Sequence, residues 1–210
     1  MCPMGRTKTY ERDTLVDRAV ELFRSHGFAS TSAAMIEETL GVNRSSIYAE
    51  FGSKQGLFDA ALEQYRQTNV DHRFGPLHEP EAGISGITAV FAFYGAAGDG
   101  PASGRGCLLC NTAIELGRDD PSDTEAVPRY LEYISGAFKS ALDDAARNGD
   151  LHSTVDTADQ AQFLAASILG IFVMLRAAAP PNAIAAAASA AIDHVESLRA
   201  EQRRVHSSKR

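Results

Sequence analysis

Residues 31–57 read TSAAMIEETLGVNRSSIYAEFGSKQGL, and this stretch predicts two short helices joined by a glycine turn. Ser32 can cap the first helix, and Gly41 allows the sharp turn that separates it from the second. The second helix, from about residue 43 to 50, carries short polar side chains, one arginine and one tyrosine. Because such side chains suit base edges and phosphates in a DNA major groove, the stretch predicts a helix-turn-helix.

The predicted DNA contacts lie in an N-terminal arm, at helix starts and along the second short helix. Residues 1–10 are polar and predict a flexible arm. Free amides at a helix start favour a phosphate nearby. The alternative is a plain three-helix unit in which residues 43–48 are merely solvated. The candidate DNA-contacting residues are Arg6, Lys8, Thr31, Ser32, Asn43, Arg44, Ser45, Ser46, Tyr48 and Lys54.

The segment from about residue 13 to 64 resembles the DNA-binding domain of the TetR family of bacterial regulators. One departure is Glu37-Glu38, because many members carry an alanine at the first of these positions. The resemblance rests on four elements in the family's order and spacing: LVDRAVELFRSHGF at 15–28, Thr31-Ser32, GVNRSSIYAEF at 41–51 and FGSKQGLF at 51–58.

This resemblance implies a homodimer that binds double-stranded operator DNA and responds to an unknown small-molecule effector. A repressor that the effector releases from its operator is the function it favours. The helix after Lys54 would connect the DNA-binding domain to a helical domain for effector binding and dimerisation. The expected organisation is an arm at 1–10, a DNA-binding domain at 11–64 with a connector to about 73, an effector and dimerisation domain at 76–205, and a tail at 206–210.

Helical periodicity along the chain predicts an all-α fold of about nine helices. The net charge of −7 excludes a pervasive basic surface, so any DNA contact must be local. Three cysteines, an odd number, favour the cytoplasm over a secreted disulfide framework. The apolar run 163–175 is shorter than the ~20 residues of a membrane span, so we expect no membrane partner.

Cys107 and Cys110 are three residues apart, which places both thiols on one helix face. Core packing is the favoured interpretation, because free cysteine is among the most buried residue types. The alternative is a thiol sensor or redox pair, with Arg105 lowering a thiolate pKa. A zinc site would need two more ligands, and no metal or other cofactor is expected. The glycine-rich residues 98–106 predict a flexible loop.

Aromatic side chains in the C-terminal half can line an effector cavity or fill the core. Asn111 and Glu115, one turn apart, can equally face an effector or solvent. The candidate effector-pocket residues are Phe91, Tyr94, Cys107, Cys110, Asn111, Tyr130, Tyr133, Phe163 and Phe172.

Small residues in the last two helices allow close helix approach. They fit either packing within one chain or a two-fold interface between chains. The resemblance implies a four-helix dimer interface, which suits a palindromic operator. The candidate interface residues are Ala161, Ala165, Ile168, Phe172, Ile184, Ala188, Ala191, Ile192 and Val195.

Two competing functions remain open from the residues alone. The first is a DNA-binding regulator that cysteine oxidation switches. The second is a thiol-redox enzyme on the same scaffold. No predicted strand precedes the cysteine pair, and no Ser/His/Asp set has recognisable spacing, so we expect no catalytic residues and no enzymatic activity.

Overall fold

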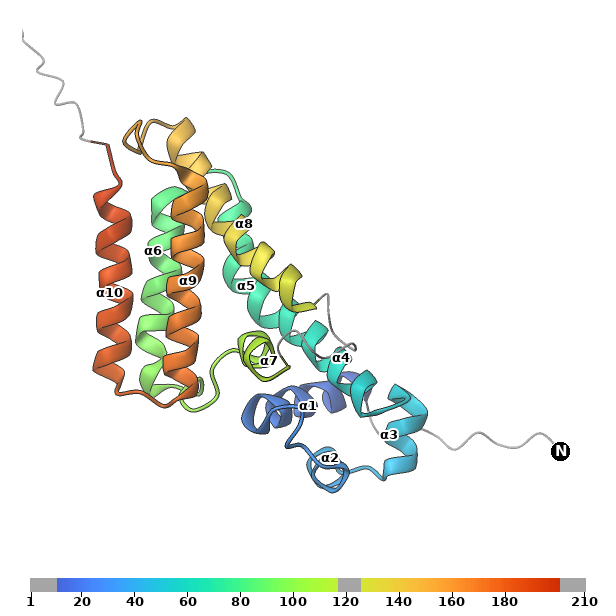
Figure 1. Ribbon diagram of the computed structural model, residues 1–210. Helices are drawn as coiled ribbons and strands as arrows, with labels where there is room; N and C mark the ends of the chain where they lie inside the picture. The colour runs from blue at the N-terminus through green and yellow to red at the C-terminus, as the bar shows by residue number, and fades with distance from the viewer. Residues whose placement is uncertain (1–10, 117–125, 201–210) are drawn as a thin grey trace, which may run out of the picture.

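The computed structural model describes residues 11–116 and 126–200, and their regular elements are helices (Figure 1). The predicted arm and tail, with Arg6 and Lys8, lie outside the described residues. The all-α prediction is confirmed. The described α-helices are α1 (Arg12–His26), α2 (Ala33–Leu40), α3 (Arg44–Phe51), α4 (Lys54–Tyr65), α5 (Asp71–Phe74), α6 (Gly83–Gly95), α7 (Leu108–Leu116), α8 (Ala126–Arg147), α9 (Thr157–Arg176) and α10 (Pro181–Ser197).

An aromatic cluster holds the N-terminal helices together. Phe23 of α1 meets Phe58 of α4 edge to face, with ring centroids 4.9 Å apart. Phe28, in the loop after α1, lies 4.7 Å from the same ring. Such pairs add to the free energy of apolar burial, so α1 and α4 form a firm base for α2 and α3.

The connector is one nearly continuous helical rod from α4 to α5, as Figure 1 shows. A π-helical turn at Arg66–Val70 joins the two helices. A 3-10 turn continues the rod through Gly75–His78, past the expected end of the connector at about residue 73. Pro76 fits there because the first turn of a helix needs no amide proton from it.

The C-terminal bundle places α6, α9 and α10 side by side, with α8 packed against α6 and α9 (Figure 1). Small residues bring α6 and α10 into close contact. A Cβ atom added to Gly95 would lie 2.6 Å from the Cβ of Ala188, well inside van der Waals distance. Small residues in these helices therefore serve close packing within one chain.

Helix α9 is the one described helix whose length and composition alone would let it cross a membrane. It is 20 residues long, so it extends beyond the apolar run 163–175. In the fold it contacts α8 and α10 and buries Leu164, Ile168 and Leu175. Packing inside the bundle therefore accounts for the apolar residues on its inward face.

Candidate nucleic-acid interface and central cavity

Local side-chain caps build the helix-turn-helix. The Ser32 hydroxyl accepts a hydrogen bond from the Met35 amide at 3.2 Å, which caps α2. Gly41 ends α2 in the left-handed conformation, at φ 70°, where a side chain would be strained. The Asn43 carboxamide oxygen accepts from the Ser46 amide at 2.9 Å and caps α3. These contacts fix the angle between α2 and α3.

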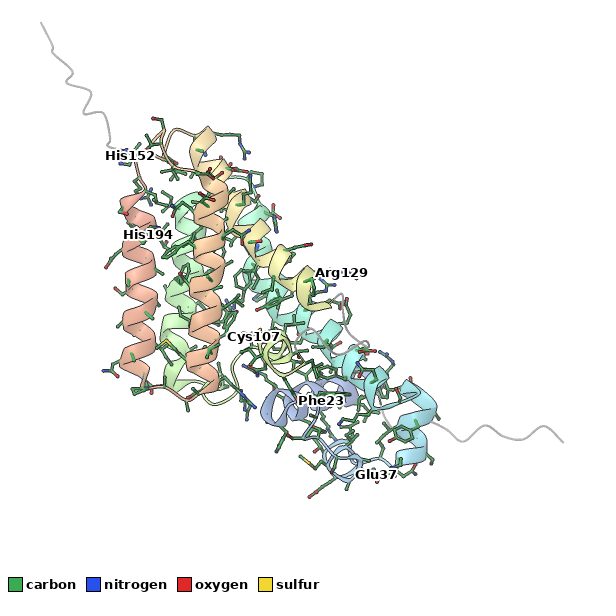
Figure 2. The ribbon with its side chains drawn as sticks, in the orientation of Figure 1. Phe23, Glu37, Cys107, Arg129, His152 and His194 are labelled. Carbon is green, nitrogen blue, oxygen red and sulfur yellow. The ribbon has the colours of Figure 1, made fainter. Side chains whose placement is uncertain are left out.

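Glu37, the departure from the family pattern, has a structural role (Figure 2). Its carboxylate accepts a hydrogen bond from the Arg44 amide at 2.5 Å, at the first turn of α3. A helix start presents unsatisfied amides and positive potential, so a carboxylate there is stabilising. Glu37 therefore ties α2 to the start of α3.

One face of α3 is exposed on the surface of the described chain. Ile47 is the buried residue of α3 and anchors the opposite face. Arg44, Ser45 and Tyr48 are exposed, and Tyr48 keeps 38% of its surface accessible. Ser46 is half-buried, and its amide donates the hydrogen bond to Asn43 that caps α3. A guanidinium, a hydroxyl and a phenol thus share a surface that a DNA groove can accept.

The structure corrects the prediction for Thr31 and refines that for Lys54. Thr31 is 1% exposed, and its hydroxyl donates to the Gly27 carbonyl at 2.6 Å, so it supports the loop and cannot contact a phosphate. The Lys54 ammonium lies 4.3 Å from the centroid of the Phe28 ring. Burial lowers the pKa of Lys54, while Glu115 opposes that shift.

A polar seam joins α1 and the loop after it to the C-terminal bundle. Glu115 of α7 accepts from the amides of Phe28 at 3.0 Å and Ala29 at 2.7 Å. Arg176 of α9 donates to the carbonyls of Arg24 at 2.9 Å and Ser25 at 3.0 Å. Glu115 is exposed, and its carboxylate also holds the loop after α1 in place. Sequence reasoning missed this role because its partners are backbone groups far away in the chain.

A cavity of about 450 Å³ lies where the connector, the end of α6 and α9 meet. Its size falls within the usual range for small-molecule sites. Aromatic and polar side chains share its walls, and none of the lining residues is acidic. The lining residues are Arg24, Tyr65, Thr68, Asn69, His72, Arg73, Phe93, Tyr94, Ala96, Ala97, Gly100, Pro101, Ala102, Gly106, Cys107, Phe172 and Leu175.

Three of the predicted pocket residues line this cavity: Tyr94, Cys107 and Phe172. Sequence reasoning missed the connector residues, although 66–73 contains one apolar residue, Val70, in an otherwise polar run. A polar run of this length is the signal that could have predicted that part of the connector lines a cavity. Val70 is buried, whereas Thr68, Asn69 and His72 are exposed.

The other predicted pocket residues have different places. Phe91 is buried and stacks on Phe138, and Cys110 is buried in α7. Tyr130 is buried and shares a hydrogen bond with the Cys107 thiol at 3.2 Å. Each of these residues packs in the core because it lies on the inward face of its helix.

Three further predicted pocket residues lie away from the cavity. Asn111 faces a separate hollow of about 290 Å³ beside α7, and its amide donates to the Arg105 carbonyl at 2.7 Å. Tyr133 packs against His78, with ring centroids 5.6 Å apart. Phe163 is 48% exposed on α9. All six of these predicted residues thus lie outside the lining of the central cavity.

Cys107 and Cys110 are both buried in the C-terminal half (Figure 2 labels Cys107). Burial raises the pKa of the Cys110 thiol to about 12, and the neighbouring Cys107 adds to the shift. Cys110 is therefore protonated at neutral pH, the unreactive form of a thiol. Within the described ranges, no three His, Cys, Asp or Glu side chains gather in a metal-binding arrangement.

The predicted dimer residues pack within the chain. Ala161, Ala165, Ile168, Phe172, Ile184, Ala188, Ala191 and Val195 are buried in the monomer, and Ile192 is half-buried. The prediction is corrected because α9 and α10 turn these side chains toward their neighbours in the bundle. Their outer faces remain open: Phe163 and Val173 are 48% and 44% exposed, and Gly170 is also exposed.

Sequence comparison identifies relatives along most of the chain. The family described as "Bacterial regulatory proteins, tetR family" matches residues 15–61, and "Tetracyclin repressor-like, C-terminal domain" matches residues 83–191. The HTH-type transcriptional repressor ComR of Escherichia coli (strain K12) is 29% identical over 181 residues, 82% of each chain. YezE of Bacillus subtilis (strain 168), an HTH-type transcriptional regulator, is 28% identical over 80% of this chain and 87% of its own.

Solved structures share the fold. A cysteine mutant of the TetR family transcriptional regulator CifR, complexed with a 26-base-pair operator DNA, gives a TM-score of 0.78 at 26% identity, over 90% of this chain and 98% of that one. The reduced form of E. coli NemR gives 0.75 at 21% identity, over 90% and 96%. With both of its parts matched by family descriptions, the chain belongs to the TetR family and is a DNA-binding transcriptional regulator.

Proposed function

We propose that this regulator is a repressor in the cytoplasm that binds operator DNA as a homodimer and leaves it when a small molecule enters the central cavity. One observation carries the proposal: the connector lines the cavity with Tyr65, the last residue of α4, and Arg73 of α5, and its α4 part packs on α1. A ligand in the cavity therefore touches the element that orients the DNA-binding helices.

Residues 11–64 supply the DNA-binding domain in this proposal. The exposed face of α3 with Arg44, Ser45 and Tyr48 enters a major groove, and the amides at the start of α2 face the phosphate backbone. Lys54 would contribute charge beside the Phe28 ring. The repressor ComR and the operator complex of CifR support this assignment.

The residues from 76 to 205 would form the effector and dimerisation domain. The outer faces of α9 and α10 offer exposed apolar and small residues, among them Phe163, Gly170, Val173 and Ala190. A symmetric pairing of these faces would bury them in a four-helix interface. Two recognition helices would then address two halves of a palindrome.

Release would follow from a difference in ligand affinity between two arrangements of the connector. A ligand that spreads the cavity walls would shift Thr68 and His72 and so tilt α4. The seam at Glu115 and Arg176 would carry movements of α7 and α9 to α1. The distance between the two recognition helices would change, and both would no longer fit their grooves.

A second candidate trigger is oxidation of Cys107, because this thiol lines the cavity and contacts Tyr130. Ligand binding is the better supported trigger, since both cysteines are buried and the Cys110 pKa is raised. Replacing both cysteines by serine distinguishes the two triggers: oxidant-induced operator release vanishes in this variant only if thiols are the switch. We propose no catalytic role for the chain.

The deciding experiment is fluorescence anisotropy of the purified protein with its own upstream promoter DNA across a salt series. We expect specific, salt-sensitive binding that the Arg44→Ala, Tyr48→Ala double variant loses. Arg147→Ala is the matched control, because Arg147 is exposed on α8 and pairs with Asp144. Equal weak binding to any DNA, or equal losses in both variants, would contradict the proposal.

A further inference from the structure

The central cavity is positively charged, although the whole chain carries a net charge of −7. Arg24 and Arg73 line it, and none of its lining residues is an aspartate or a glutamate. A concave surface with one sign of charge and apolar walls concentrates ligands of the opposite sign. The cavity therefore favours an anion.

Arg73 is the cation of the cavity that can bind an anionic ligand. Its guanidinium lies 3.4 Å from the centroid of the Phe93 ring, and within the described residues no carboxylate pairs with it. Arg66, two turns earlier, pairs with Glu63 at 2.7 Å and with Asp71 at 2.6 Å. Stacking uses the face of a guanidinium and leaves its N–H groups, which lie in the plane of the group, for a planar acceptor.

Arg24 adds a second positive charge on the α1 side of the cavity. Its Nε donates to the Gly106 carbonyl at 2.8 Å, and its Nη1 is 3.5 Å from Glu21, so it is already positioned. Burial raises the pKa of Tyr94, and both Arg73 and Arg24 oppose that shift. Both guanidinium groups therefore act on the same space beside the Tyr94 hydroxyl.

Aromatic rings form the rest of the wall. Tyr94 meets Phe172 edge to face at 4.8 Å and Phe93 edge to face at 5.0 Å. Rings in this arrangement suit a flat apolar body, which can stack or meet them edge on. The cavity volume of about 450 Å³ accommodates a molecule of one or two fused or linked rings.

We propose that the effector is a small aromatic carboxylate whose charged group binds Arg73, with its ring system in the cavity against the aromatic wall of Phe93, Tyr94 and Phe172. The planar fork of a guanidinium matches a carboxylate in a two-point hydrogen-bonded pair. Arg24 stabilises the same anion from α1. This assignment rests on the proposed function, because it names the class of ligand for the same cavity.

The position of Arg73 gives the anion a route to the DNA-binding helices. Arg73 lies in α5, directly after the π-helical turn Arg66–Val70, and Arg24 lies in α1. An anion between them attracts both elements at once. Since π-turns are less regular than α-helix and are common at functional sites, this segment is the part of the connector best able to change register.

The test uses benzoate, 2-naphthoate and biphenyl-4-carboxylate, each beside its neutral primary amide, in calorimetric titrations of the full-length protein. We expect at least one carboxylate to bind roughly ten- to a hundred-fold tighter than its amide, the range for a hydrogen bond to a charged group. Arg73→Gln should remove this preference and leave amide binding unchanged. Arg73→Lys, which keeps the charge without the fork, should retain part of it.

Arg66→Gln is the matched control, because it removes the same charge from the same connector outside the cavity lining. Amides that bind as tightly as carboxylates, equal losses in the two Gln variants, or no binding of any carboxylate would overturn the anion assignment. Anisotropy with operator DNA separates the two proposals. Amides that release the operator would leave the proposed function intact, whereas carboxylates that bind at Arg73 without release would contradict that function and support the site.

Discussion

The two short helices of the DNA-reading surface and the long helices of the bundle are stabilised in different ways. Helices α2 and α3 have eight residues each, and each begins with a side-chain cap and ends at a glycine. Helix α3 buries one residue, Ile47. Helix α10 has 17 residues and no side-chain cap, but it buries Ile184, Ala188, Ala191 and Val195.

This difference has a functional consequence. Local hydrogen bonds hold α3 while leaving one face uncovered, as a DNA-reading helix requires. The bundle helices depend on contacts from distant parts of the chain, so nearly every inward residue is used for packing. Substitutions should therefore act locally in the first region and throughout the fold in the second.

The largest expected effect is the loss of a bundle aromatic. Phe138 is fully buried, and the centroid of its ring lies 5.7 Å from that of Phe91 and 5.8 Å from that of Phe74. Phe138→Ala should lower the free energy of unfolding by about 3–5 kcal/mol, measured by urea denaturation at a fixed protein concentration. Ile114→Ala, at a side chain that is 64% exposed, is the control and should cost far less. Similar losses in both variants would break the comparison.

Substitutions of two glycines test the local contacts that hold the first region together. A Cβ atom on Gly56 would lie 2.1 Å from the Phe51 carbonyl oxygen, so Gly56→Ala should cost about 3 kcal/mol and weaken operator binding. Gly52 has a φ of 77° and no neighbour within 4 Å of such an atom. Its ψ of −48° lies outside the left-handed helical well, so Gly52→Ala should cost about 1–3 kcal/mol from backbone strain alone. Thermal unfolding measures both, and the reverse order would contradict the close contact.

A smaller effect is expected at the seam between the two regions. Glu115→Gln keeps the shape of the side chain and removes the charge that binds the amides of Phe28 and Ala29. The loss should be about 1 kcal/mol, the difference between charged and neutral hydrogen-bond acceptors. Hydrogen exchange of the loop after α1 should accelerate. Asp143→Asn, which affects an ion pair with Lys139, should leave that loop unchanged. Unchanged hydrogen exchange in Glu115→Gln would exclude a stabilising role of the Glu115 charge in the loop after α1.

The last effect is negligible at neutral pH, because it is a pH dependence to which Cys110 contributes only above its ordinary pKa of 9.0. The pKa of Cys110 rises from 9.0 to about 12 in the folded chain, with burial as the main cause. Between these values the unfolded thiol loses its proton and the folded thiol keeps it, so stability falls as the pH rises. Cys110→Ala should reduce the slope of unfolding free energy against pH in this window. A slope equal to that of the unsubstituted protein would exclude Cys110 as a contributor.

The sequence predicted the helix-turn-helix well because its signals are local. Ser32, Gly41 and Asn43 act within a few residues of their own positions, and the polar face of α3 follows from helical periodicity. Thr31 is the exception in this region. Its hydroxyl donates to Gly27 instead of staying free, because the path of the loop decides which of two neighbouring hydroxyls points outward.

The bundle and the cavity could be predicted only in part. The sequence by itself determined that the C-terminal half is helical, with an apolar run at 163–175, but long alanine-rich helices carry apolar residues on several faces. Tertiary structure alone decided that Ala188 faces Gly95, that Phe163 faces outward and that Arg73 reaches Phe93. The physical reason is that a cap acts over one helical turn, whereas a cavity wall exists only after distant helices have packed against one another.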